Sequence, residues 1–371
     1  MTFVLRQRTT SFSTHLQHMT RITLSLLAIV CLLGVESPAS AETKPLLNVL
    51  FIVSDDLRDH LGCYGNKTVQ TPNVDRLAAR GVRFERAYVQ YPVCNPSRSS
   101  FLTGLRPDQT GVTDNTTLLR SKLPEVVTLP QLFRQHGYYA AAFGKIFHLG
   151  GGRDAAARER WMDLPKSWDE AHAYQATPAG RIIEGRNLTG GKLNWCQWGM
   201  TAGTDDDQPD GQNAREAIAL IEKLGDKPWF IGLGFQKPHD PFVAPKKYFD
   251  LYPPGSIALH RDPPDMTPAP PLAVGFGEFG AAFDKFTDTE RMEFQRAYYS
   301  GVSFIDAQLG RVLDALDRLR LTERTLVVFM GDHGYHLGER QWWNKNAVFE
   351  RSVRTPLIIA ERVASPVRPA G

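Results

Sequence analysis

Short uninterrupted runs of apolar residues recur along the chain and predict buried strands. The first covers residues 48–53 and reads NVLFIV, immediately before Ser54, Asp55 and Asp56. A run of this kind favours a strand that is buried on both faces, as in a parallel sheet covered by helices. Similar runs predict further strands over residues 139–143, 229–235, 326–330 and 357–360.

Segments with an apolar period near 3.6 residues lie between these runs and predict helices. Asn73 is in position to cap a helix that ends at Gly81. Other helices are predicted over residues 128–136, 213–224 and 290–319, the last being the longest. Because strands alternate with helices, the chain is predicted to have an α/β layered fold.

Two regions break this alternation. Residues 150–210 and 253–271 are rich in Gly, Pro, Asp and Trp and show no clean period. We interpret them as long surface insertions, which often carry the loops that select a substrate. Trp195 and Trp198 in the first region could stack on a sugar ring, although packing in the interior is the commoner role of tryptophan.

The N-terminus has the pattern of an export signal. Three arginines give it a positive charge: Arg6, Arg8 and Arg21. Residues 24–35 are apolar but too few to span a bilayer comfortably, and Ala39-Ser40-Ala41 resembles a cleavage site. We therefore expect a signal peptide over residues 1–41 and a catalytic domain over 42–371, in place of the alternative of a membrane anchor.

Export places the protein in the periplasm or outside the cell, or in the secretory or lysosomal route of a eukaryote, with no stable membrane insertion after the signal is removed. The composition gives no sign of a nucleic-acid binder. The formal net charge is only +3, charged residues make up 22% of the chain, and no basic cluster is interleaved with aromatic residues.

The cysteine count singles out one position. If Cys31 leaves with the signal, then Cys63, Cys94 and Cys196 remain, which is an odd number. One disulfide, for which Cys63 and Cys196 are available, plus one special residue fits this count. Cys94 lies in the polar segment VCNPSRSS. It could be half of a disulfide, a thiol nucleophile, a metal ligand or the precursor of another group.

Acidic, lysine and histidine residues follow four of the predicted strands. These residues are Asp55 and Asp56, then Lys145 and His148, then His239, then Asp332 and His333. In open α/β sheets, ligands bind outside the carboxyl ends of the strands. Four such exits on one predicted edge indicate a binding site there.

The aspartates supply the hard oxygen ligands that Ca²⁺ or Mg²⁺ prefers. An Asp-Asp pair alone is more typical of a helix cap. Adding Asp332 and His333 at a second strand exit favours a metal site, although histidine is a poor ligand for a hard cation and His333 is the weakest member.

Other residues would suit an oxyanion bound beside such a metal. Arg98, Lys145 and Lys345 are candidate anion binders, although solvated surface positions are the usual fate of such side chains. A divalent cation with several fixed positive groups suits sulfate or phosphate. His148 and His239 could transfer protons, since their ordinary pKa lies near 6.5, or could be structural histidines.

These motifs together resemble those of a known family. The segment CNPSR followed by SSFLTG resembles C-x-P-S-R-x-x-x-L-T-G, the signature of type I sulfatases in the alkaline phosphatase superfamily, at which a separate enzyme oxidises the cysteine to Cα-formylglycine. Other matching segments are SDDLR at 54–58, TPNVDRLAARG at 71–81, GKIFH at 144–148, KPHDPF at 237–242 and GDHGYHLGE at 331–339. The forms GKIFH, KPH, DHGYHLGE and the later Lys345 are most similar to the iduronate-2-sulfatase branch.

The resemblance, which runs from about residue 46 to the end of the chain, implies an alkaline-phosphatase-like α/β/α sandwich with a mostly parallel central sheet. It also implies a site with one Ca²⁺, Mg²⁺ being less expected. The implied metal ligands are Asp55, Asp56, Asp332, His333 and the modified Cys94. The implied catalytic residues are Arg98 steadying the formylglycine, Lys145 and Lys345 gripping the sulfate, His148 assisting the formylglycine hydroxyl, and His239 protonating the leaving alcohol.

The implied activity is hydrolysis of a sulfate ester on a carbohydrate, with a 2-O-sulfated uronic acid as one substrate and a formylglycine-generating enzyme as maturation partner. The alternatives are an arylsulfatase, a phosphodiester or phosphonate hydrolase on the same scaffold, and a catalytically silent sulfated-glycan binder. Members of the family usually continue into a smaller C-terminal subdomain, which we expect to be missing here because the sequence stops at Gly371.

Overall fold

The computed structural model describes residues 46–150, 154–270, 273 and 282–361. The predicted signal peptide and Cys31 lie outside these residues. The described residues all belong to the unit Leu46–Gly371. Among them, no helix combines the length and the apolar character that crossing a bilayer requires.

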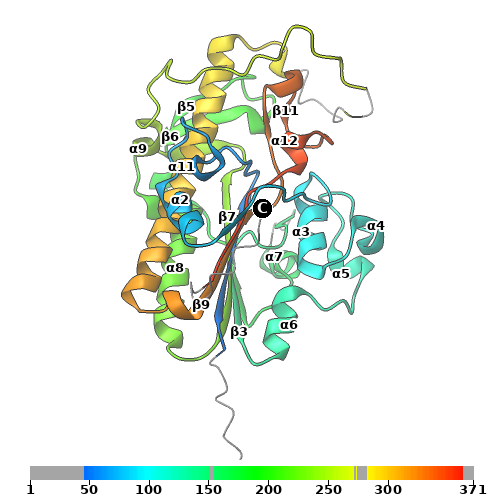
Figure 1. Cartoon of the computed structure of the whole chain (residues 1–371), viewed down its shortest axis with the longest axis vertical. Helices are drawn as coiled ribbons and strands as arrows, with labels where there is room; N and C mark the ends of the chain where they lie inside the picture. The colour runs from blue at the N-terminus through cyan, green and yellow to red at the C-terminus, as the bar shows by residue number, and fades with distance from the viewer. Residues whose placement is uncertain (1–45, 151–153, 271–272, 274–281, 362–371) are drawn as a thin grey trace, which may run out of the picture. The chain divides into compact units, whose positions relative to one another are not determined.

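A seven-stranded sheet forms the centre of this unit (Figure 1). In spatial order its strands are β2 (Val82–Phe84), β12 (Leu357–Ala360), β9 (Thr325–Gly331), β1 (Asn48–Asp55), β7 (Trp229–Pro238), β3 (Tyr139–Gly144) and β4 (Glu170–His172). Strand β1 runs parallel to both β9 and β7, and β3 runs parallel to β7 and β4. Among the described strands of this sheet, β12 runs antiparallel to both of its neighbours, β9 and β2. The predicted mostly parallel sheet is therefore confirmed.

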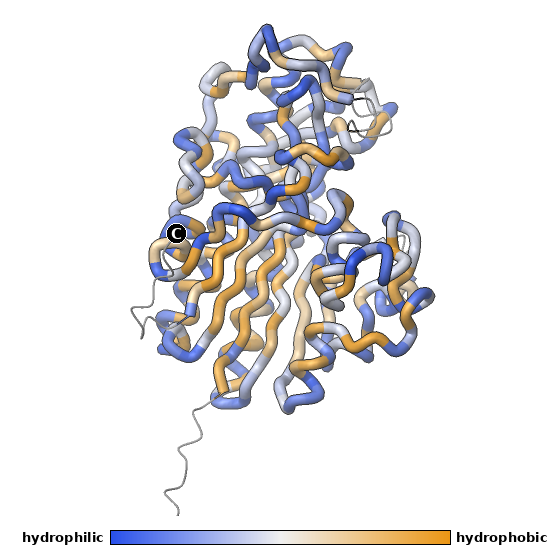
Figure 2. The backbone as a smooth tube through the Cα atoms, turned by 45° about the vertical axis from the view of Figure 1, so that its right-hand side comes forward, coloured by the Kyte–Doolittle hydropathy of each residue, from blue (hydrophilic) through white to orange (hydrophobic). Residues whose placement is uncertain are grey.

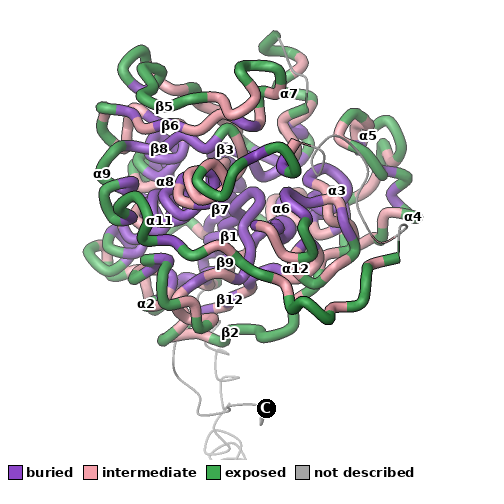
Figure 3. Tube along the Cα trace, turned by 90° about the horizontal axis from the view of Figure 1, so that it is seen from above, coloured by how far each residue is buried: buried purple, intermediate pink, exposed green. Residues whose placement is uncertain are grey.

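Helices cover both faces of the sheet, as the uninterrupted apolar strands predicted. On one face pack α2 (Pro72–Ala79), α8 (Pro209–Leu224) and α11 (Asp288–Arg318), and on the other pack α3 (Cys94–Thr103) and α6 (Leu129–Gln135). Alternate residues of β1 enter two separate cores: Leu50 and Ile52 join the first, and Val49, Phe51 and Val53 join the second. Figure 2 shows the apolar strands and Figure 3 their burial between the two helical layers.

Shorter elements complete the fold. The short helices are α4 (Pro107–Thr110), α5 (Leu119–Lys122), α7 (Ala155–Met162), α9 (Lys246–Phe249) and α12 (Glu350–Val353). The 3-10 turns are Gly62–Tyr64, Ala179–Arg181, Asn194–Cys196, Asp205–Asp207, Thr322–Arg324 and Glu339–Gln341. A two-stranded ribbon pairs β10 (His336–Leu337) with β11 (Trp343–Asn344).

The five predicted strands and the long helices all form, with ends shifted by a few residues. Thr128 caps α6 by accepting a hydrogen bond from the backbone of Gln131. The expected capping role of Asn73 is wrong. Helix α2 begins at Pro72, because a proline fits the first turn, and the Asn73 side chain donates to Asp306 of α11 instead.

The prediction of an irregular insertion over residues 150–210 is also wrong. This segment contains α7 and β4, and its strands β5 (Ile183–Asn187) and β6 (Gln197–Thr201) join β8 (Phe242–Pro245) in a three-stranded sheet. The strands are too short for a period to show. Residues 253–270, by contrast, form neither helix nor strand, as predicted.

The two tryptophans of the segment are partly buried and pack against the first core. The Trp195 ring stacks on Phe283, with centroids 5.8 Å apart, and Trp198 lies 6.1 Å from Phe249. Both rings contact the first core, which favours their structural role over sugar stacking.

The three cysteines in the described ranges do not pair. Cys63, Cys94 and Cys196 are all free thiols, so the disulfide considered between Cys63 and Cys196 is absent. Burial, reinforced by Asp75, raises the pKa of Cys63 to about 12, and burial together with Asp240 raises that of Cys196 to about 12. Both thiols are therefore protonated at neutral pH.

Candidate active site

Four adjacent parallel strands end at the same edge of the sheet and bring the predicted residues together. Asp55 ends β1 and is followed by Asp56, Lys145 follows β3, and Asp332 and His333 follow β9. His239 follows β7. Cys94 reaches the same edge from the first turn of α3, which lies beside the sheet (Figure 3).

Cys94 is at the centre of the resulting cluster and is 1% exposed. Its thiol donates to Asp55 Oδ1 at 3.3 Å, and its Sγ lies 3.3 Å from His333 Nε2. Lys345 Nζ donates to the same sulfur at 3.2 Å. Burial and the charge of Asp55 act to raise the pKa of Cys94, but Lys145, Lys345 and His333 outweigh them and hold it well below its ordinary value.

Three buried carboxylates face three buried cationic groups. Lys145 Nζ contacts Asp55 Oδ2, and Lys345 Nζ lies 2.6 Å from Asp56 Oδ1. The Arg98 guanidinium lies 2.9 Å from Asp332 Oδ2 and 3.5 Å from Asp55 Oδ1. Burial alone would raise the pKa of Asp55, but Lys145, His239 and Arg98 hold it well below its usual range. Burial and Asp55 raise the pKa of Asp332.

The donors fit a divalent cation. Ligand atoms of Asp55, Cys94, Asp332 and His333 lie within 4.8 Å of one another, and so do those of Asp55, Asp56, Cys94 and His239. Asp56 Oδ2 is buried and makes no hydrogen bond, so one carboxylate oxygen is free to bind an ion. Hard carboxylate oxygens in this number suit Ca²⁺ or Mg²⁺.

His333 is fully buried against the carboxylates. Its Nε2 lies 3.4 Å from Asp56 Oδ1 and 3.6 Å from Asp332 Oδ2, and its Nδ1 lies 3.0 Å from the Gly334 carbonyl. Burial lowers the pKa of His333, but Asp332 and Cys94 outweigh burial and raise it to about 9. The ring is therefore oriented with Nε2 toward the cluster.

The spacing of Cys94 and Arg98 places both on one face of α3, because residues four apart lie one helical turn from each other. Arg98 Nη1 donates to the carbonyls of Lys145 and Ile146, the second at 3.0 Å. Ser97 Oγ donates to the Asp332 carbonyl at 2.5 Å. Helix α3 is thus tied directly to the loops after β3 and β9.

The two remaining histidines both lie at the cluster. Burial lowers the pKa of His148, although a hydrogen bond with Cys94 acts in the opposite direction, so this ring is beside the Cys94 side chain. His239 Nε2 lies 4.0 Å from Asp56 Oδ2. Burial and Lys345 lower the pKa of His239, but Asp56, Asp240 and Asp55 outweigh them and raise it to about 9.

Two residues that the sequence did not single out support this cluster. The buried carboxylate of Asp210, at the start of α8, accepts hydrogen bonds from the backbone of Gln236 at 2.8 Å and Lys237 at 2.9 Å. It thereby fixes the end of β7 just before His239. Tyr298 of α11 contacts the backbone of Asp56. Neither residue had a sequence signal. Asp210 followed a segment without a clean period, and Tyr298 continued the apolar period of the helix predicted over residues 290–319.

The sequence of this chain is similar to those of known proteins. The sequence model of the sulfatase family matches residues 47–363. Mouse iduronate 2-sulfatase is 35% identical over 363 residues, which cover 91% of this chain and 64% of the relative. The human iduronate 2-sulfatase is 36% identical, covering 90% and 63%. The chain thus spans less than two thirds of the length of these relatives.

More distant similarity extends to other enzymes. A choline-sulfatase of Rhizobium meliloti is 30% identical over 84% of this chain and 62% of its own length. The structure of a phosphonate monoester hydrolase of Agrobacterium radiobacter matches with a TM-score of 0.67 at 23% identity, covering 85% of this chain and 68% of that one. A 2-O GAG sulfatase structure matches with a TM-score of 0.57 at 23% identity, covering 85% and 64%. At 23% identity, these two structures support the fold of this chain and nothing about its substrate.

Proposed function

Because the chain belongs to the sulfatase family, we propose that it hydrolyses sulfate esters at the cluster around Cys94. The observation that carries this proposal is the contact of the Cys94 sulfur with Asp55, His333 and Lys345 in one buried site. The proposed substrate is a sulfated carbohydrate, and a 2-O-sulfated uronic acid is favoured because the two mammalian relatives are iduronate 2-sulfatases.

The nucleophile is proposed to be formylglycine, made from Cys94 by a separate maturation enzyme. Once formed, this residue supplies a hydrated aldehyde, whose two hydroxyls serve for attack on sulfur and for later release of sulfate. A cysteine thiolate lacks the second hydroxyl and has no comparable release step. The burial of Cys94 at the start of α3 supports this assignment, since the position faces the cluster and little else.

One Ca²⁺ is the proposed metal, held by Asp55, Asp56, Asp332, His333 and the modified Cys94. Mg²⁺ is less favoured because it demands near-ideal octahedral geometry and usually keeps several waters. Three carboxylates already balance Arg98, Lys145 and Lys345, so a divalent ion leaves the site with net positive charge. That charge attracts a sulfate ester and stabilises the negative charge that develops during transfer.

The remaining residues are proposed to position groups and move protons. Lys145 and Lys345 bind the sulfate oxygens, and Arg98 steadies the residue at position 94 from the next turn of α3. His148, beside Cys94, takes a proton from the attacking hydroxyl. His239, near Asp56, donates a proton to the leaving alcohol oxygen.

Peptide mass spectrometry of position 94 in protein from the native host tests the nucleophile. Conversion of the thiol to the aldehyde replaces sulfur by oxygen and removes two hydrogens, while the peptides that contain Cys63 and Cys196 keep their thiol masses and serve as internal controls. An unmodified Cys94 in protein that turns over substrate would contradict the formylglycine mechanism.

A substrate panel tests the reaction. Sulfated uronate disaccharides, aryl sulfates and phosphodiesters are compared by kcat/KM, and sulfate esters are expected to be the preferred class. Activity confined to phosphodiesters or phosphonates would overturn the sulfatase assignment. Tight binding of sulfated glycans without turnover, by protein whose Cys94 is unmodified, would instead identify a catalytically silent binder.

We further propose that the protein is exported, with cleavage after Ala41. The supporting observation is the order of arginines, a short apolar run and small residues near the N-terminus. N-terminal sequencing of the protein from a periplasmic or extracellular fraction is expected to begin at Glu42. Intact Met1 in that fraction would contradict the proposed cleavage.

A further inference from the structure

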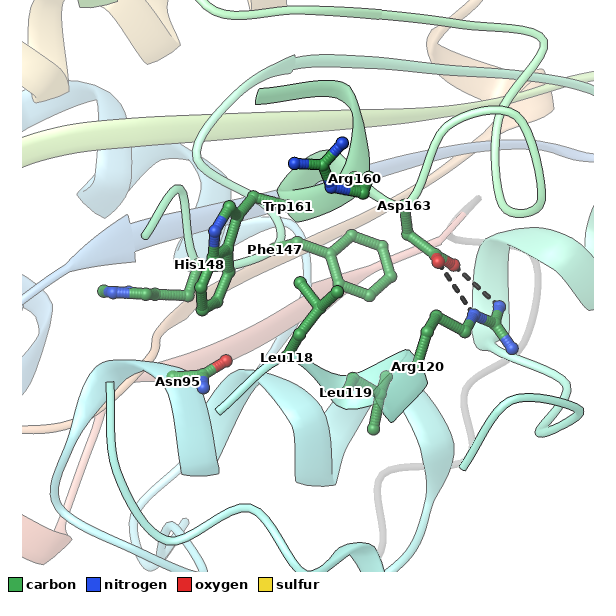
Figure 4. Close-up of a pocket in the computed structure, with 9 residues that line it drawn as sticks. All are labelled: Asn95, Leu118, Leu119, Arg120, Phe147, His148, Arg160, Trp161 and Asp163. Carbon is green, nitrogen blue, oxygen red and sulfur yellow. Dashed lines mark hydrogen bonds and ion pairs between the residues drawn. The ribbon is translucent and has the colours of Figure 1, made fainter. Parts of the chain in front are cut away.

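A narrow crevice with a volume of about 10 Å³ is lined by Asn95 and by His148, the histidine whose ring contacts Cys94 (Figure 4). One side is formed by Asn95, the residue that follows Cys94 in α3, and by His148 after β3. The other side is formed by Arg160 and Trp161, near the end of α7. A substrate with its sulfate at Cys94 therefore has α7 as a neighbour.

The Trp161 ring is fixed against the His148 ring. The two centroids lie 5.7 Å apart at an interplanar angle of 76°, an edge-to-face contact. The indole also lies close to the backbone of Gly150, where an added Cβ would come within 2.1 Å of it. Trp161 thus gives the crevice a rigid aromatic wall at the point where it meets His148.

Two arginines line the crevice, and they differ in their partners. Arg120 is neutralised by Asp163, with two nitrogen–oxygen distances of 2.7 Å, and also donates to the Gln131 side chain. Within the described ranges, Arg160 has no ion-pair or hydrogen-bond partner for its guanidinium. Figure 4 shows this guanidinium turned away from the Arg120–Asp163 pair, toward the side on which His148 lies.

An unpaired guanidinium beside an anion-binding site points to a second anion on the substrate. Guanidinium binds a carboxylate through two parallel hydrogen bonds, a geometry that neither an alcohol nor an amide reproduces. A tryptophan ring next to it offers apolar surface for the body of a pyranose. A sulfated uronic acid carries both features, a sulfate ester and a carboxylate, on one ring.

We propose that Arg160 and Trp161 form a subsite for the carboxylate-bearing ring of a sulfated uronic acid, with Arg160 binding the carboxylate. The subsite rests on the proposed function. It implies that residues of α7 determine the preference for a sulfated uronate over a sulfated neutral sugar. Sulfated substrates that lack a carboxylate leave Arg160 without a partner and lose the contribution of this contact.

Arg160→Ala tests the subsite, with Arg158→Ala as the matched control. Arg158 is an exposed arginine on the same helix, and it does not line the crevice. The substrates are a 2-O-sulfated uronate disaccharide and the same disaccharide with its carboxyl group reduced to the alcohol. The ratio of kcat/KM for the first over the second is expected to fall roughly tenfold or more in Arg160→Ala, as a charge-assisted contact is lost. It stays unchanged in Arg158→Ala.

Arg160→Lys keeps the charge without the planar fork and is expected to give an intermediate ratio. Equal losses on both substrates, or an unchanged ratio in Arg160→Ala, would overturn the subsite while sulfate-ester hydrolysis stands. If the wild type hydrolyses no sulfate ester at all, the proposed function fails first and the subsite fails with it. Melting temperatures of the three variants identify any loss that reflects unfolding.

Discussion

The hydroxyl of Tyr298 donates a hydrogen bond to the backbone carbonyl of Asp56 at 2.7 Å and accepts one from the backbone N–H of Arg58 at 3.1 Å. Asp56 has a φ of 62°, a left-handed conformation that residues with a side chain rarely adopt. Because one hydroxyl from α11 bridges both sides of this turn, it holds the strained conformation that directs the Asp56 carboxylate into the cluster.

Tyr298→Phe is therefore expected to weaken metal binding while leaving the fold in place. Loss of a bridging hydrogen bond of about 0.5–1.5 kcal/mol corresponds to a rise in the Kd for Ca²⁺ of roughly three- to tenfold. Calorimetric titration of the metal-free protein measures it. Tyr299→Phe is the control, since that hydroxyl contacts Gln295 and His60 and not the Asp56 turn. Equal Kd values for the two variants would exclude this role of Tyr298.

Cys94→Ala is expected to reduce kcat by about three orders of magnitude or more, as removal of a nucleophile does in other enzymes. The fold survives because the side chain is small and its contacts are polar. Turnover of an aryl sulfate and the melting temperature are measured together, with Cys63→Ala as the control thiol. Appreciable turnover by Cys94→Ala would show that another group attacks sulfur.

Asp332→Asn is expected to lower metal affinity and activity together. The Asp332 carboxylate accepts from the Asp56 backbone at 3.0 Å and from Arg98 Nε at 3.0 Å, so the amide loses a ligand charge and turns an N–H₂ group toward Arg98 or the ion. We expect a rise in the Kd for Ca²⁺ of roughly tenfold or more. Asp314→Asn, at an aspartate whose side chain is 67% exposed, is the control. Unchanged metal content in Asp332→Asn would remove Asp332 from the ligand set.

His336 is expected to make stability fall in mild acid. Burial lowers its pKa to about 3, with Arg58 and Arg351 acting in the same direction against Glu339. The unfolded chain, with a histidine pKa of about 6.5, therefore binds more protons between pH 6.5 and 3, and stability in this window rises with pH. From pH 7 to pH 5, His336 is expected to lower the free energy of unfolding by about 2 kcal/mol.

Urea unfolding of the wild type and of His336→Gln gives the free energy of unfolding at pH 7 and at pH 5. The loss between the two pH values is then compared between the two proteins. His172→Gln is the control, because the His172 side chain is 42% exposed, whereas His336 is buried. The loss between the two pH values should be smaller in His336→Gln than in the other two proteins. A pH dependence identical in all three would show that His336 does not stay neutral in the folded state.

Several features followed from the sequence alone. Uninterrupted apolar runs such as the one in β1 predicted a doubly covered sheet, because only a strand without a solvent face can be apolar at every position. Since parallel strands end at one edge, Asp55, Asp332 and His239 were predicted to meet there. Helix α3, which places Cys94 and Arg98 one turn apart, was not among the predicted elements.

Tertiary structure decided what lies around these residues. Lys345 reaches Asp56 from 289 residues away, and Tyr298 from 242, distances along the chain over which no local pattern carries information. The short strands β5 and β6 were invisible because each is stabilised by its partner strand and not by its own period. Free Cys63 and Cys196, and the unpaired Arg160 in the same crevice as His148, also depend on which surfaces the fold brings together. The sequence thus determined the chemistry at each strand end through local periodicity, whereas the partners of each group were set by long-range packing.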